Sequence, residues 1–104
     1  MITTNSMKVT QELHIIRAHL LQYASLLEDF KESIRFIQDT PNPVMSSPAH
    51  RSEYTLSQDL MNKECQNLLT QINRLDMSRE MWDNRLTNVL HLVRSAAHYL
   101  SEAE

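Results

Sequence analysis

Hydrophobic residues in the first half of the chain recur with a heptad period. The steps between them alternate between four and three residues without a break. These positions are Val9, Leu13, Ile16, Leu20, Tyr23, Leu27, Phe30, Ile34 and Ile37. Such a stripe is typical of a left-handed coiled coil or of a tightly packed helical bundle. The spacing predicts a helix over residues 7–39, after a flexible N-terminus at residues 1–6.

Prolines separate this helix from the next one. Pro41 and Pro43 each disfavour helical geometry at the residue before them, so residues 40–50 are predicted to form a loop rich in proline and serine. Two starts of the following helix stay open. Ser47 and Pro48 fit an N-cap and a first helical position. Thr55, with a glutamine three residues later, fits a capping box.

The heptad pattern resumes in the second half and predicts a helix over residues 51–101. Its positions are Tyr54, Gln58, Met61, Cys65, Leu68, Ile72, Leu75, Arg79, Trp82, Leu86, Val89, Val93, Ala96 and Leu100. Because the connection is short, the two helices are expected to lie antiparallel. The sequence therefore predicts an all-α fold: one domain, a coiled-coil-like antiparallel two-helix hairpin with a longer second helix.

The difference in helix length predicts an uncovered end. One register pairs Leu27 with Met61, and another pairs Leu27 with Leu68; both leave residues from about 85 onward beyond the first helix. That end is apolar, through Leu86, Val89, Leu90, Val93, Ala97 and Leu100. An exposed apolar patch usually marks an interface, and a two-helix core is thin. We expect protein helices to cover this end, from a second copy or a larger assembly.

Arg79 is a charged residue in the otherwise apolar stripe. Asp76 and Asp83 lie three and four residues away on the same helix, where either can form an ion pair with it. A pair with Glu12 of the first helix is the other interpretation, because a buried polar pair can set the register of two helices. Both stay open.

Composition excludes several classes of function. The chain has no glycine, which excludes glycine-rich phosphate-binding loops. Its net charge is −3, and no basic face favours nucleic acid. The single Cys65 is expected to be a buried thiol in an intracellular protein. No apolar run approaches the roughly 18 residues of a membrane span. The sequence predicts no catalytic residue, no metal ligand and no cofactor.

Several stretches resemble the cytosolic helical region of fungal CorA-like proteins, relatives of divalent-cation (chiefly Mg²⁺) transporters. The stretches are residues 20–30, 36–43, 63–69, 74–79 and 85–93. The resemblance covers about residues 13–95, and its most specific parts are Thr40-Pro41-Asn42-Pro43 and the Arg-Leu-x-Asn-Val segment that begins at Arg85.

This resemblance implies a place in a stalk. In that family a long helix, corresponding to the second helix here, continues into the membrane and assembles around a five-fold axis. This sequence reads Ser-Glu-Ala-Glu after Leu100 and holds no Gly-Met-Asn signature, so no ion-site residue is carried over. The expectation is a non-catalytic helical scaffold in a membrane-protein context, soluble as given. The alternative is a free-standing coiled-coil adaptor between proteins.

Overall fold

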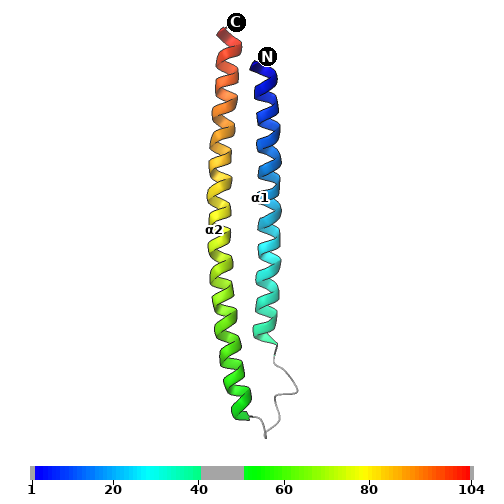
Figure 1. Ribbon diagram of the computed structural model, residues 1–104, viewed down its shortest axis with the longest axis vertical. Helices are drawn as coiled ribbons and strands as arrows, with labels where there is room; N and C mark the ends of the chain where they lie inside the picture. Colours follow the sequence, from blue (N-terminus) through cyan, green and yellow to red (C-terminus); the bar gives the residue numbers. More distant parts are fainter. Residues whose placement is uncertain (1, 41–50, 104) are drawn as a thin grey trace. The chain divides into compact units, whose positions relative to one another are not determined.

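The computed structural model describes residues 2–40 and 51–103. It contains two helices, α1 (Ile2–Asp39, 38 residues) and α2 (Arg51–Ala103, 53 residues), which run antiparallel and pack against each other (Figure 1). The predicted fold class, an all-α hairpin with a longer second helix, is confirmed. No strand occurs among the described residues. The Ser47-Pro48 start and most of the predicted loop lie outside them.

The first helix begins earlier than predicted. Residues 2–6, predicted as a flexible N-terminus, form its first turns. Ser6 is half-buried and lines a groove with Val93 of α2, so packing against the second helix extends α1. At the other end α1 stops at Asp39, two residues before Pro41, and the Thr40 N–H still donates to the Phe36 carbonyl at 3.0 Å.

The capping-box interpretation of Thr55 is wrong. The helix already begins at Arg51, and the Thr55 hydroxyl donates to the Arg51 carbonyl one turn back, at 2.9 Å. A hydroxyl in the body of a helix commonly bonds in this way. Thr55 is therefore an interior residue of α2.

The chain divides into two units, each made of one segment from each helix. Unit 1 pairs residues 2–25 of α1 with residues 77–103 of α2, and unit 2 spans Leu26–Asp76. In unit 2, Ile34, Cys65 and Ile72 are buried and pack with Leu27 and Leu69. In unit 1, Leu90 is the one buried apolar residue of the described part.

The residues that α1 and α2 turn toward each other coincide with only half of the predicted stripe. We call these buried and half-buried residues the inward row. Alternate predicted positions lie in it, namely Leu13, Leu20, Leu27 and Ile34 on α1 and Gln58, Cys65, Ile72, Arg79, Leu86 and Val93 on α2. Tyr54 is also half-buried, and Leu100, the next position of this series, is exposed. The predicted positions between these alternate ones are replaced by Thr10, Arg17, Ala24, Lys31 and Gln38, and by Leu69, Asp76, Asp83, Leu90 and Ala97. Compared with the predicted stripe, the inward row is therefore shifted around the axis of each helix and contains more polar residues.

Both predicted registers are wrong. Leu27 packs against the cluster that contains Ile72, and Arg17 lies opposite Asp83, so α1 reaches further along α2 than expected. Relative to the second predicted register, α1 is displaced by about four to five residues along α2, or roughly 7 Å.

For this reason the predicted overhang of residues 85–100 does not occur. Leu90 is only 4% exposed, and Leu86, Val93 and Ala97 are half-buried against α1. Of the six residues predicted for an uncovered interface, Val89 and Leu100 are exposed, at 42% each.

Candidate functional site

The predicted stripe positions that are missing from the inward row form exposed apolar rows instead. In unit 1 these residues are Val9, Ile16 and Tyr23 of α1 with Trp82, Val89 and Ala96 of α2. In unit 2 they are Phe30 and Ile37 of α1 with Met61, Leu68 and Leu75 of α2. The large side chains among them are between 42% and 63% exposed. We name the two sets flank 1 and flank 2, after their units.

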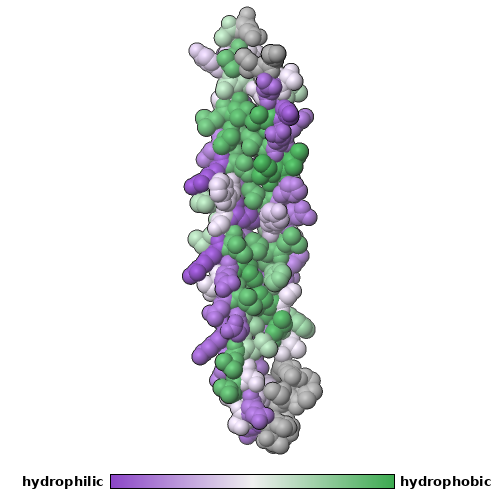
Figure 2. Space-filling model, in the orientation of Figure 1, coloured by the Kyte–Doolittle hydropathy of each residue, from purple (hydrophilic) through white to green (hydrophobic). Residues whose placement is uncertain are grey.

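In each unit both helices contribute to the same flank. Most flank residues directly precede one inward position and come four residues before the next: Val9, for example, precedes Thr10 and Leu13. The offset is the same on both helices, and in an antiparallel pair equal offsets fall on one side. Val9 and Ala96 accordingly line one shallow groove. Figure 2 shows apolar side chains gathered over both helices on one face of each unit.

A polar contact joins the two helices on the other side of unit 1. His14 Nε2 lies 3.1 Å from Arg94 Nη2, joining the two helices there. Arginine only donates, so this imidazole nitrogen accepts the hydrogen bond. The α2 residues on this side are Glu80, Thr87 and Arg94, none of them apolar. Unit 1 therefore has one apolar flank and one opposite flank that is polar along α2.

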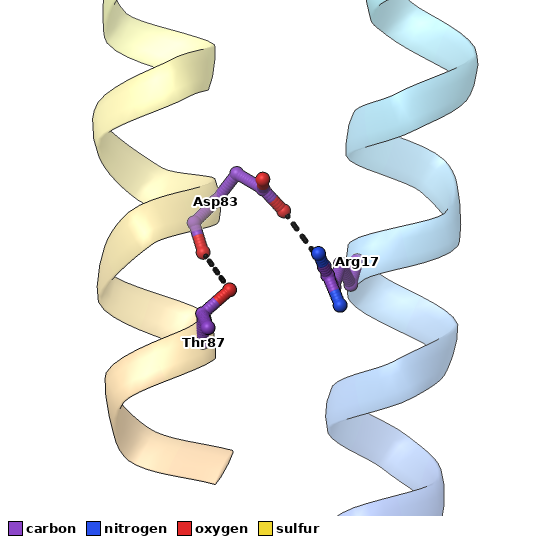
Figure 3. A network of polar contacts seen from close by, with 3 residues as sticks. All are labelled: Arg17, Asp83 and Thr87. Carbon is purple, nitrogen blue, oxygen red and sulfur yellow. Dashed lines mark hydrogen bonds and ion pairs between the residues drawn. The ribbon is translucent and has the colours of Figure 1, made fainter. Parts of the chain in front are cut away.

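A charged pair inside unit 1 joins the two helices in the register that leaves flank 1 exposed. Arg17 Nε donates to the Asp83 carboxylate at 3.1 Å, with the Arg17 side chain 40% exposed and that of Asp83 19% exposed (Figure 3). Thr87 donates its hydroxyl to the Asp83 backbone carbonyl at 2.9 Å, one turn further along α2. A partly buried pair between two helices can specify their register.

The register-setting residues predicted from the sequence were different. Arg79 is half-buried on the inward row, whereas Glu12 is exposed. With Arg17 opposite Asp83, the level of Arg79 falls near Leu20, about 12 Å along α1 from Glu12. This level does not favour the predicted Arg79–Glu12 pair, which stays a prediction. Asp83, predicted as one partner of Arg79, forms an ion pair with Arg17. The signal for this pair was two opposite charges one position away from the apolar stripe.

Trp82 is the bulkiest side chain of flank 1. It is 51% exposed, and the Arg85 guanidinium lies 5.1 Å from the centre of its ring. That distance is within the range of a cation–π contact, which holds the indole against the helix surface. Cys65, in contrast, is buried in unit 2 as a free thiol. Of these two residues, only the indole is accessible to a partner.

The described residues contain no group of three or more His, Cys, Asp or Glu side chains placed to hold a metal ion. A shallow hollow beside Asp29 and Glu32 on α1 also includes Phe36 and Ile37, and carries only these two carboxylates. Over the part of the chain that the structure describes, neither helix has a segment with the length and apolar character needed to cross a bilayer.

No protein-family profile, curated protein or solved structure matches this chain. The CorA-like stalk therefore stays a prediction from the sequence stretches alone.

Proposed function

We propose that this protein is a non-catalytic helical scaffold and oligomerisation module that docks further helices on its apolar flanks. The observation behind the proposal is that both helices of each unit leave an apolar row exposed on the same side. Helices that contact one neighbour need apolar residues at two heptad positions, whereas helices in a bundle use a third position beside them. The three-position pattern here suits a bundle of more than two helices.

The surface of the chain supports the same proposal. Exposed leucine, phenylalanine and tryptophan side chains lie on the two helices. Burying apolar surface stabilises an assembly by about 25 cal/mol per Å². Covering a flank with another helix would recover that free energy.

Two settings are proposed for this scaffold. In the first, the chain is similar to the cytosolic stalk of a CorA-like Mg²⁺ transporter-like protein and assembles within a membrane-protein context. In the second, it is a free-standing adaptor that joins proteins through helices. The first rests on the sequence stretches that end at residue 93, and the second needs only the flanks.

Multi-angle light scattering with flank variants tests the proposal. The variant Ile16→Glu places a charge on flank 1, and Leu21→Glu places the same charge at an exposed leucine on the opposite flank. We expect the unmodified chain and Leu21→Glu to have a mass above 12.2 kDa, and Ile16→Glu to be monomeric. If all three chains are monomers at high concentration, the scaffold proposal fails.

The same measurement with and without Mg²⁺ separates the two settings. A pentamer, or an assembly that depends on Mg²⁺, favours the stalk. A dimer that is indifferent to Mg²⁺ favours the adaptor.

A further inference from the structure

We infer that the occupant of flank 1 is the same flank of a second copy of this chain, with each Trp82 seated in the groove beside Val93 and Ala96 of the other copy. This inference rests on the proposed docking function and adds the identity of the partner. It concerns unit 1 alone, and it follows from the shape of that flank.

Flank 1 carries both a projection and a hollow. Trp82 projects from α2 at one level, half-exposed and held by Arg85. About three to four turns further along α2, Val93 and Ala96 line the shallow groove together with Val9, Ser6 and Asn5 of α1. The groove is apolar on its α2 side, and the small Ala96 side chain leaves room there. A large flat ring fits such a hollow better than an aliphatic side chain does.

The spacing of these two features is what makes the flank self-complementary. Trp82 and Ala96 lie seven residues on either side of Val89, which is itself an exposed flank residue. A two-fold axis that passes beside Val89, in the plane of the interface and perpendicular to α2, places two α2 helices antiparallel. Each Trp82 then faces the Ala96 level of the other copy, and the two Val89 side chains meet. Such isologous contacts close after two copies.

Flank 1 has the composition of an interface centre, because it combines Trp82 with the aliphatic Val9, Ile16 and Val89. An aromatic anchor surrounded by aliphatic residues is the usual composition of the energetically dominant centre of an interface. The contact between the two helices of unit 1 buries little apolar surface, since only Leu90 is buried there among the described residues. A second copy would bury the apolar side chains of flank 1 that this contact leaves exposed.

Trp82 is the single tryptophan of the chain, so its fluorescence reports directly on this contact. As concentration rises in sedimentation experiments, we expect a monomer–dimer equilibrium, with a parallel blue shift of the emission and loss of acrylamide quenching. Ala96→Phe fills the groove and should weaken dimerisation about tenfold or more. Asn88→Phe adds the same ring on the outward side of α2 and is the matched control, with no expected effect.

Cross-linking tests the two-fold axis. Under mild oxidation, Val89→Cys should give a disulfide-linked dimer in high yield, because the two copies of this residue meet at the axis. Asn88→Cys, its exposed neighbour, should not, and the buried Cys65 is common to both chains. Equal cross-linking of both variants, or a dimer in which Trp82 stays as quenchable as in the monomer, would overturn the inference.

One further experiment distinguishes a failure of this inference from a failure of the proposed docking function. A synthetic amphipathic peptide with leucine heptads is added to the chain at a concentration where the chain is monomeric. If the chain never dimerises but the peptide protects Trp82 from acrylamide, the second copy is the wrong occupant and the docking function stands. If neither a second copy nor the peptide protects Trp82, both proposals fail.

Discussion

The two units of the hairpin hold their helices together by different means. Unit 2 has a small apolar core in which Ile34, Cys65 and Ile72 are 4%, 4% and 7% exposed. Unit 1 has a charged pair, Arg17 with Asp83, where a core would be expected, and only Leu90 is buried there among the described residues. Burial of apolar side chains therefore stabilises the interior of unit 2, whereas the interior of unit 1 contains a polar contact that can specify the register of its helices.

This difference shows why a flank can matter more to one unit than to another. Apolar side chains in unit 1 are not scarce, since its flank alone carries Val9, Ile16, Tyr23, Trp82 and Val89. They lie beside the inner contact instead of within it. A partly buried ion pair contributes little net stability, because its desolvation offsets most of the attraction. Unit 1 consequently has more to gain from a partner that covers its flank.

The largest effect is expected from the core of unit 2. Ile72→Ala removes buried methylene groups that pack against Leu27 and Leu69, and should lower the free energy of unfolding by about 2–4 kcal/mol in urea denaturation. Leu75→Ala is the matched control three residues away, because Leu75 is 59% exposed on flank 2. At low concentration the control should cost less than about 1 kcal/mol. Equal costs for the two variants would mean that the inward row is not where unit 2 gains its stability.

A smaller effect is expected from the charged pair of unit 1. A double-mutant cycle with Arg17→Gln and Asp83→Asn should give a coupling of about 0.5–1 kcal/mol, because the Arg17 side chain is 40% exposed and water screens the pair. The coupling should fall as salt is added. His98 and Glu102, at 76% and 69% exposed, form the comparison pair and should couple less. A coupling as large as the Ile72→Ala cost would contradict the contrast between the units.

The fold was predictable from the sequence because the heptad period and the helix-breaking prolines decide it. The heptad stripe, the absence of glycine and the prolines after Asp39 together indicate two helices in a hairpin. The face of contact was not predictable in the same way. The apolar surface of each helix is three heptad positions wide, and the hairpin uses only one edge of it.

Choosing between the two edges required knowledge of the partner helix. The edge that the structure uses carries Arg17 and Lys31 on α1 and Asp76 and Asp83 on α2, all at positions where an apolar residue is the ordinary expectation. The Arg17–Asp83 pair at 3.1 Å makes that edge possible, and it joins residues 66 apart in sequence. Local pattern carries no information about such a pairing, so the register and the flanks were missed together.

The smallest effect on stability is expected from a substitution near the start of α2, in unit 2. If Thr55 capped the helix, Thr55→Ala would cost about 1 kcal/mol. Because Thr55 lies within the helix and its hydroxyl bonds the Arg51 carbonyl, alanine should instead be neutral or stabilise by a few tenths of a kcal/mol, through its higher helix propensity. Thr70→Ala is the control, since Thr70 makes the equivalent bond to the Gln66 carbonyl deep within α2, also at 2.9 Å. Thermal denaturation of both variants at equal concentration measures the difference. A clear loss for Thr55→Ala alone would move the start of the helix toward Thr55 and shorten unit 2 at that end.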